Sequence, residues 1–342
     1  MPALTRGIGK QLSIGVAKEA TRGSTPATIT YWLGVSEWEA EERYNNAVQE
    51  QTFGVIEDSI GQTRVKNWAD IQLKAPLGDA SFPLFLYSML GTLSSGNHPG
   101  ETTVKDHVLT VAQTVQHQSL SFYLHDPITT PNGASADYTY ANGVVSKLDI
   151  DFSLGKFIEY TATIKSLAGS QSKQVLPYVP AQTTENLFVP QYLTFKATTA
   201  GVAALAGTTA IKLKSAKISL DQNIEDDDVL GSVGPRDYLN KEFKAEGTLE
   251  AILQNESDFK VASIANTPVS LLFDMINSDT TIGVASSHPE LSIEFSNVIF
   301  TEYSRPVKIK DIMYQTVKFK AHYSTSLARM IRATATNTVT SY

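Results

Sequence analysis

One stretch of the chain, residues 66–91, changes its hydrophobic period halfway along, and this limits what the chain can fold into. From residue 68 to residue 75 polar and apolar side chains alternate, which is the pattern of a strand with one buried face. After it, Ser81 can cap a helix, Pro83 suits the first turn, and Gly91 can end it. The residues between leave almost no polar face, so this helix must be buried. We predict a strand, a tight turn and a covering helix.

Because this helix is apolar on all sides, we predict that it packs against something else besides its own sheet. A helix that is apolar all round has more apolar surface than one sheet covers, and exposed patches of that kind mark interfaces. We therefore expect it to pack against another subunit as well. The side chains assigned to that contact are Phe82, Phe85, Leu86 and Met89.

Composition removes several classes of function. With 342 residues and 42% hydrophobic content the chain can build a real core, and it has no apolar run near the roughly 20 residues that a membrane span needs. The amino terminus lacks the pattern of a secretory signal, and we expect an extended arm there. The absence of cysteine excludes disulfides, thiolate metal sites and cysteine nucleophiles. A net charge of −7 argues against broad attraction to nucleic acid.

Strand patterns dominate the chain and occur in two series. The first contains strands over residues 28–42 and 119–125, a long polar loop over 43–65, and a hairpin of 144–154 with 157–167. Residues 169–190 have the composition of a linker. The second series contains strands over 210–223, 242–253, 269–275, 290–302 and 312–323. It also contains a polar loop over 224–239 and a helix over 255–266.

The matching order of these elements predicts an internal duplication. The expected organisation is an arm over 1–27, a first β domain over 28–168, a linker over 169–190 and a second β domain over 191–342. In this pairing Asp70 corresponds to Glu246 and Leu73 to Leu249. The alternative is one large sandwich whose strands resemble one another only because strands generally do.

No catalytic or metal-binding motif is found. The six histidines lack metal-ligand spacing, and phosphate-binding glycine motifs and nucleophile elbows are absent. The run from Glu225 to Asp228 lacks the alternation of a calcium loop and predicts a solvated acidic loop. The carboxylates Asp149 and Asp151 lie on one side of an alternating strand, which is typical of an outward-facing sheet. We expect neither an enzyme nor a cofactor.

Two stretches carry a resemblance to a known family. N-W-A-D-I-Q-L-K-A-P-L-G-D-A-S-F-P-L-F-L-Y-S-M-L-G, from Asn67, resembles the strand and helix of tail tube proteins from bacteriophages with long, non-contractile tails. V-V-S-K-L-D-I-D-F-S-L-G-K-F-I-E-Y-T-A-T-I-K-S, from Val144, resembles the hairpin that follows in that family. The start I-G-K-Q-L-S-I-G-V-A-K-E-A-T-R-G-S-T-P is similar to the beginning of such proteins. The likeness covers residues 8–170 well, and the rest only through the internal repeat.

The resemblance implies a mainly β fold of duplicated tail-tube-like β-sandwich or barrel domains, each flanked by a short helix. It implies a structural virion protein that forms stacked rings around a lumen through which DNA leaves the capsid. A duplicated chain would form trimeric rings that imitate a hexamer, although the second half could instead be a decoration domain. The implied partners are further copies of the chain, the tape-measure protein, other tail proteins and double-stranded DNA in transit. The implied locations are the virion tail and, during assembly, the host cytoplasm.

The resemblance implies roles for two sets of residues. An acidic lumen repels DNA phosphates, and the candidates to line it are Glu37, Glu39, Asp149 and Asp151. The long loops would mediate stacking between rings, and the candidates there are Glu50, Phe53, Glu57, Glu225, Asp226, Asp227 and Asp228. The alternative function is a receptor-binding or glycan-binding module, which would need an exposed aromatic platform.

Overall fold

The computed structural model describes residues 9–51, 54, 56–126, 137–171, 183–199, 205, 208–252, 259–306 and 312–342, and they form a mainly β protein. The elements of the first half are η1 Gly9–Gln11, β1 Ser13–Lys18, β2 Tyr31–Leu33, β3 Glu37–Gln49, β4 Gly61–Pro76, α1 Phe82–Leu90, β5 Gly91–Asn97, β6 Lys105–Val111, β7 Leu120–His125, β8 Tyr138–Ser153, β9 Glu159–Ser166 and β10 Ser170–Gln171. Those of the second half are η2 Pro190–Tyr192, β11 Leu193–Thr199, β12 Ala210–Ile211, β13 Leu213–Asp221, β14 Ile224–Asp227, β15 Asp237–Asn240, β16 Lys244–Ile252, α2 Lys260–Ile264, β17 Val269–Ile276, β18 Glu290–Ser304, β19 Tyr314–Ala321 and β20 Ile331–Asn337.

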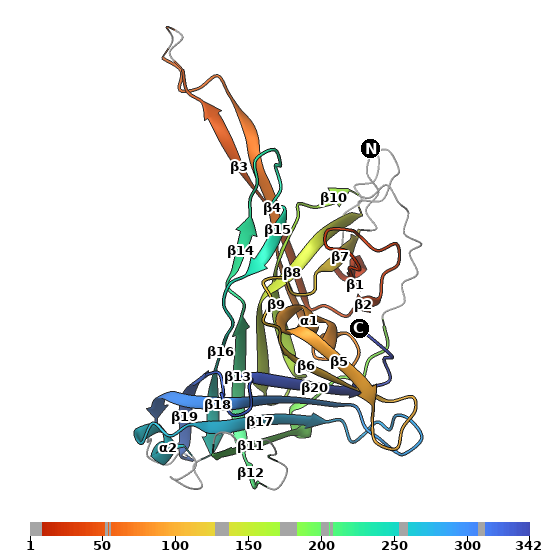
Figure 1. Ribbon diagram of the computed structural model, residues 1–342, viewed down its shortest axis with the longest axis vertical. Coiled ribbons are helices and arrows are strands. Elements are labelled where there is room, and N and C mark those ends of the chain that lie inside the picture. Colours follow the sequence, from red (N-terminus) through yellow and green to blue (C-terminus); the bar gives the residue numbers. More distant parts are fainter. Residues whose placement is uncertain are drawn as a thin grey trace, which may run out of the picture.

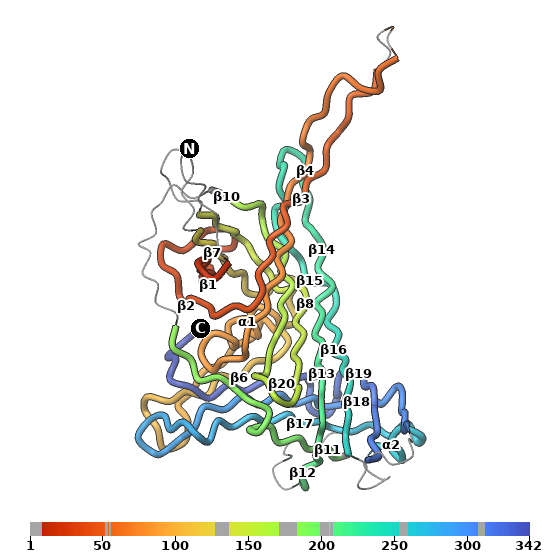
Figure 2. The backbone as a smooth tube through the Cα atoms, turned by 180° about the vertical axis from the view of Figure 1, so that it is seen from behind, coloured from red at the N-terminus to blue at the C-terminus, as the bar shows by residue number. Residues whose placement is uncertain are grey.

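A long antiparallel sheet runs through both halves and dominates the molecule (Figures 1 and 2). Its strands follow in the order β3, β4, β9, β8, β13, β16, β19 and β18, each hydrogen-bonded to the next. The pairing of β8 with β13 joins the two halves within this one sheet. Antiparallel sheets of this kind can leave one face to solvent while the other packs on a core.

The remaining strands build the layers that cover the apolar face of the long sheet. In the first half β1 pairs with β2 and β7, and β7 pairs with the beginning of β8. In the second half β11 pairs with β17, and β17 pairs with the beginning of β18, as does β20. β20 also pairs with β6 of the first half, and β6 pairs with β5, so the two halves are joined a second time. A single hydrophobic core therefore spans both halves.

The stretch 66–91 folds as the sequence predicts. In β4, Ala69, Ile71, Leu73 and Ala75 are buried, and the residues between them are less covered. Helix α1 begins after Ser81 with a proline in its first turn, but the Ser81 side chain makes no capping hydrogen bond. Gly91 ends the helix with a φ of 83°, a conformation that costs glycine little because it has no Cβ.

The apolar side chains of α1 are covered by the chain itself. Phe82, Phe85, Leu86 and Met89 each have an exposed fraction of 0%. The ring of Tyr160 on β9 lies 4.9 Å from that of Phe82 and 5.2 Å from that of Phe85, centroid to centroid. Each fully buried side chain of this size contributes about 1.5–3 kcal/mol to stability. The structure therefore leaves none of their surface for a second subunit.

Two segments predicted to be polar loops form β-hairpins instead. Residues 43–49 extend β3 and residues 61–65 begin β4, so most of the first loop belongs to a hairpin arm. The second loop contains the paired strands β14 and β15. Figure 1 shows the arm projecting beyond the body at one end of the molecule, with β14 and β15 beside its base. Because solvent reaches both faces of the arm, its strands lack the alternation that marks a half-buried strand.

Other differences lie at the ends of the predicted domains. The amino-terminal segment expected to be an arm contains strand β1, whose Ile14 and Val16 are buried. Strand β20 was not predicted. Helix α2 occupies only residues 260–264 of the segment 255–266, and none of its five residues is buried, whereas α1 is almost wholly buried. This difference between the two helices agrees with the sequence, because the second segment carries more charge.

The two halves use the same order of strands around the long sheet. β3, β4, β9 and β8 in the first half have counterparts in β13, β16, β19 and β18 in the second. Along the chain, α1 lies between β4 and β7 in the first half, and α2 lies between β16 and β17 in the second half. The domain boundaries and the duplication itself stay predictions.

The burial of α1 makes a testable prediction. Replacing Phe85 with alanine should lower the free energy of unfolding by about 3–5 kcal/mol, because it leaves a cavity beside Tyr160 and Phe122. The control is Val261→Ala in α2, where the side chain is 57% exposed and the change should be below about 0.5 kcal/mol. Urea unfolding followed by circular dichroism measures both. Equal losses would contradict the different burial of the two helices.

Candidate functional site

The four carboxylates predicted to line a lumen lie on one face of the long sheet. They are Glu37, Glu39, Asp149 and Asp151. Glu37 lies opposite Lys74, and Lys74 lies opposite Thr161. Thr161 also lies opposite Asp149. Because directly opposed residues in an antiparallel sheet share a face, the register brings strands β3 and β8 into one polar surface, which we call the polar face.

Ion pairs cross the polar face and give it charges of both signs. The Lys74 Nζ lies 3.7 Å from a carboxylate oxygen of Glu37. Asp149 Oδ2 lies 3.1 Å from Lys147 Nζ and 3.6 Å from Lys217 Nζ, which belongs to β13 across the junction of the halves. Opposite charges on neighbouring strands stabilise a sheet. The polar face therefore carries a network of ion pairs, whereas the sequence predicted a row of carboxylates.

Asp151 shows how these pairs keep a carboxylate ionised. Partial burial acts to raise its pKa, but the hydroxyl of Ser153 donates to it and the ammonium of Lys156 lies 3.1 Å away. The hydrogen bonds and the positive charge outweigh burial and hold the pKa of Asp151 below its usual value. This side chain therefore stays negative throughout the neutral range.

The acidic run 225–228 is used mainly within the chain. Asp226 on β14 lies between two lysines of the first half, 2.9 Å from Lys66 Nζ and 2.8 Å from Lys165 Nζ. Lys66 also pairs with Asp228 at 2.6 Å. Burial acts to raise the pKa of Asp226, but the two lysines lower it below its usual value. These ion pairs fasten the β14–β15 hairpin to β4 and β9.

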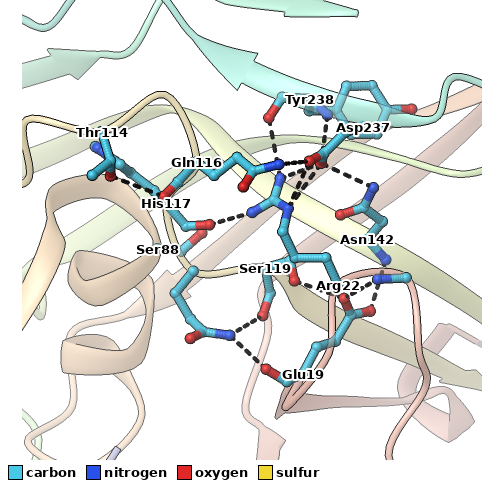
Figure 3. A network of polar contacts seen from close by, with 12 residues as sticks. Glu19, Arg22, Ser88, Thr114, Gln116, His117, Ser119, Asn142, Asp237 and Tyr238 are labelled. Carbon is cyan, nitrogen blue, oxygen red and sulfur yellow. Dashed lines mark hydrogen bonds and ion pairs between the residues drawn. The ribbon is translucent and has the colours of Figure 1, made fainter. Parts of the chain in front are cut away.

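A second set of contacts anchors the same hairpin near its other strand (Figure 3). Asp237 at the start of β15 accepts a hydrogen bond of 2.8 Å from Arg22 Nε and another from the Arg22 Nη2. The guanidinium of Arg22 also donates to the backbone oxygens of His117 and Tyr238. The side-chain amide of Gln116 donates to Asp237 at 2.5 Å. One arginine thus joins three segments that lie far apart in the sequence.

Glu19 completes this network on its amino-terminal side. Its carboxylate is 2% exposed and accepts hydrogen bonds from the hydroxyls of Ser119 at 2.7 Å and Ser121 at 2.6 Å. It also accepts the backbone N–H of Asn142 at 2.7 Å, and the Asn142 side chain reaches Asp237 at 3.3 Å. No local sequence pattern indicates this network, because its members are separated by 95 residues or more from their main partners.

Both outer edges of the long sheet are open. Within the described residues, β3 pairs with β4 alone, so its other side carries unpaired backbone groups. At the far end, residues 299–304 of β18 pair only with β19. Open edges are templates for pairing with another chain. The order of strands in a sheet cannot be read from the strands themselves, so the sequence alone did not reveal these edges.

The remaining candidates for stacking belong to the segments of the arm and of the β14–β15 hairpin. Glu50 and Glu57 are exposed there, and Phe53 lies outside the described residues. Glu225 is exposed at 59% and pairs with Lys241 at 2.8 Å, and Asp227 closes β14 opposite Asp237.

The described residues bring together no group of three or more histidine, aspartate or glutamate side chains that could hold a metal ion. In the same residues no helix is long and apolar enough to cross a membrane. Trp38 packs against the rings of Phe122 and Tyr140, each with centroids 6.3 Å apart, so this aromatic residue belongs to the core.

A family model described as phage tail tube protein matches residues 9–321 of the chain. A search of curated proteins finds no match.

The Arg22–Asp237 contact predicts a specific dependence on pH. Burial acts to raise the pKa of Asp237, but hydrogen bonds from Arg22 and from the Tyr238 N–H lower it below its usual value. A lowered pKa stabilises the fold above the unfolded value near 3.8, and this contribution is lost as pH falls through the lower folded value. Asp237→Asn should therefore lower stability by about 2 kcal/mol at pH 7.

The same variant should lose less stability than the natural chain when the pH falls from about 5 to about 3, because it lacks the titrating group. The control is Glu225→Gln, which removes an exposed pair and should change stability little. Urea unfolding at both pH values measures these effects. An equal acid sensitivity in Asp237→Asn and the natural chain would show that Asp237 does not carry this pH dependence.

Proposed function

Because the chain belongs to the phage tail tube protein family, we propose that its copies join edge to edge into rings and that the rings stack into the tail tube. The chain is a structural component of the phage tail, and the proposal concerns how it builds the tube. The proposed assembly is a trimeric ring with pseudo-sixfold symmetry, and DNA passes through its lumen without specific binding. We also propose the tape-measure protein and other tail proteins as partners, and the host cytoplasm as the place of assembly.

One observation carries the proposal: the long sheet is continuous through both halves and ends in two open edges, β3 and residues 299–304 of β18. Unpaired edges invite uncontrolled association unless they are covered, and closing the sheet into a barrel removes them. The two edges belong to different strands, so a contact between them is head-to-tail. Contacts of that type form a closed ring when the rotation between neighbours is suitable.

The polar face becomes the wall of the lumen in this assembly. The other face of the sheet is covered by the core, so the polar face is the one that can meet water and DNA. Its lysines are paired with carboxylates, as Lys74 is with Glu37 and Glu159. A lysine held in an ion pair is a poor partner for phosphate, and charges on the wall act over only about 8–10 Å in salt. DNA can then move along the tube without being held.

The hairpin arm is proposed to contact the neighbouring ring. It projects beyond the body along the direction of the long strands, as Figure 2 shows. An extension in this direction reaches across a ring boundary when the strands are tilted around a barrel. The candidates at this contact remain Glu50, Phe53 and Glu57 on the arm, with the run 225–228 on the hairpin beside its base.

Shortening the arm tests the stacking role. Asn46 lies opposite Arg64, so residues 47–63 can be replaced by an Asn-Gly turn that closes the hairpin there. Electron microscopy of the purified natural chain should show tubes, and the shortened variant should form rings that do not stack. Tubes of ordinary length from the variant would contradict the stacking role, and a natural chain that stays monomeric at high concentration would contradict the tube proposal itself.

Reversing charge on the polar face tests the lumen assignment. Tubes of a Glu37→Lys, Glu39→Lys variant should bind short DNA duplexes that tubes of the natural chain do not, because position 37 lies opposite Lys74 and position 39 opposite Gln72, so neither added lysine directly faces a carboxylate. The affinity should fall with salt, with a slope near −0.9 per phosphate neutralised on a logarithmic scale. Glu57→Lys with Asp58→Lys, on the arm, is the matched control. Co-sedimentation of duplexes with tubes measures binding, and equal binding by both variants would place Glu37 and Glu39 outside the lumen.

A further inference from the structure

The junction between the two halves contains information about the junction between subunits. The pairing of β8 with β13 is a finished edge-to-edge contact, with residues 147–153 of β8 opposite residues 215–221 of β13. β18 holds in the second half the position that β8 holds in the first. β3 likewise holds the position of β13. If a ring repeats this contact between chains, the register of the internal junction can be transferred to β18 and β3.

A shared bulge aligns β18 with β8. In the first half Val145 lies opposite Ile164, Ser146 is skipped, and Lys147 lies opposite Thr163. In the second half Phe300 lies opposite Phe319, Thr301 is skipped, and Glu302 lies opposite Lys318. Bulges are specific features of a fold and are retained where the geometry needs them. The two strands are thus matched by residue at this point.

The skipped residues make the same hydrogen bond. Ser146 Oγ donates to the backbone oxygen of Thr163 at 3.0 Å. Thr301 Oγ1 donates to the backbone oxygen of Lys318 at 3.4 Å. Thr163 and Lys318 are the residues that face the strand directly after the bulge in each half. Ser146 therefore corresponds to Thr301, and three residues later Asp149 corresponds to Ser304.

The alignment of β3 with β13 follows from the strands between. Ile71 lies opposite Ile164, and Gly247 lies opposite Phe319, so Ile71 corresponds to Gly247. Ala40 lies opposite Ile71, and Ile218 lies opposite Gly247.

Ala40 then corresponds to Ile218. One residue further Glu41 corresponds to Ser219, and two residues beyond that Arg43 corresponds to Asp221. These correspondences locate the residues of β3 that would occupy the places held by β13 at the internal junction.

We infer that the ring closes with β3 of one chain antiparallel to β18 of the next, with Glu41 opposite Ser304 and Arg43 opposite Glu302. This inference rests on the proposed ring. It copies the internal junction, where Ser219 lies opposite Asp149 and Asp221 lies opposite Lys147. The occupant of each open edge is therefore a second copy of this chain in one defined register.

Charge supports this register independently of the alignment. At the internal junction an aspartate on β13 faces a lysine on β8. At the inferred junction an arginine on β3 faces a glutamate on β18, so the signs are exchanged but remain opposite. Both side chains are exposed in the single chain, at 48% for Arg43 and 65% for Glu302. There Arg43 pairs with Glu41 at 2.6 Å and Glu302 pairs with Lys318 at 2.8 Å. A shift by two residues would place Glu41 opposite Glu302, which opposes two negative charges.

The chain has no cysteine, so paired cysteine substitutions can read the register directly. Three variants carry Ser304→Cys together with Glu39→Cys, Glu41→Cys or Arg43→Cys. The three positions on β3 point to the same face and are all exposed. Directly opposed Cα atoms lie within the range of a disulfide, but positions two residues away lie about 7–8 Å or more apart. Each variant is assembled under reducing conditions, checked for rings by electron microscopy, and then oxidised.

The Glu41→Cys, Ser304→Cys variant should form disulfides between chains at least about fivefold more completely than the other two. Because each chain links head-to-tail to the next, its largest covalent species should be a trimer. Rings with preferred linkage from Glu39→Cys or Arg43→Cys, or rings without linkage from any pair, would overturn this register and leave the proposed ring intact. A natural chain that forms no rings would overturn both.

A charge exchange gives a second measurement that needs no oxidation. Arg43→Glu or Glu302→Arg alone should raise the concentration required for ring formation about fivefold, since each places like charges opposite one another. The double variant should restore assembly to near the natural concentration. Independent, additive effects of the two substitutions would overturn the contact between Arg43 and Glu302.

Discussion

The hydrogen-bonded pairing of β8 with β13 is the interaction on which the rest of the structure depends. It turns the sheets of the two halves into one surface, and within the described residues the long sheet ends in open edges at β3 and at the end of β18. Gln222, directly after β13, is fully buried, and its side-chain amide donates to the backbone oxygens of Ser88 and Val145. This joins α1, β8 and the second half at one point. Loss of these acceptors would leave a buried amide unpaired and would lower stability by about 1–3 kcal/mol. The Gln222 contacts therefore favour the observed pairing of β8 with β13.

The two halves have the same order of strands in the continuous sheet, but they differ in the elements that pack around it. α1 is almost wholly buried because it packs between β8 and the strands β5 and β6, whereas α2 covers only part of β18 and keeps Val261 and Ile264 exposed. The β14–β15 hairpin lies between β13 and β16, where the first half has the projecting end of the β3–β4 arm between β3 and β4. Unlike the arm, this hairpin is held against the first half by the ion pairs of Asp226 and Asp237. This hairpin therefore connects the second half to the first.

The sequence predicted the local structure where one face of a strand is buried. The alternation at Ala69, Ile71 and Leu73 and the hairpin around Gly155 were confirmed, because burial on one side imposes a period of two. The arm was predicted as a loop because strands with solvent on both sides lose that period. The segment of β14 and β15 was also predicted as a loop, although Asp237 and Tyr238 of β15 are buried. The contact of Arg22 with Asp237, 215 residues apart, could not be predicted, since only the folded chain brings them together. The open edges were missed for the same reason.

The mixed charge of the polar face suits a conduit better than a uniformly acidic wall would. Carboxylates alone, such as Asp149 and Asp151 on one strand, would repel one another across the sheet as well as repelling DNA, and the sheet would lose stability. Placing Lys147 and Lys217 around Asp149 removes this repulsion. A phosphate that approaches Lys217 must compete with a carboxylate already 3.6 Å away. The counterion release that drives DNA onto a basic surface is therefore largely absent, because the lysines have protein carboxylates as their counterions. In the proposed tube, the same ion pairs that stabilise the wall keep it from holding DNA.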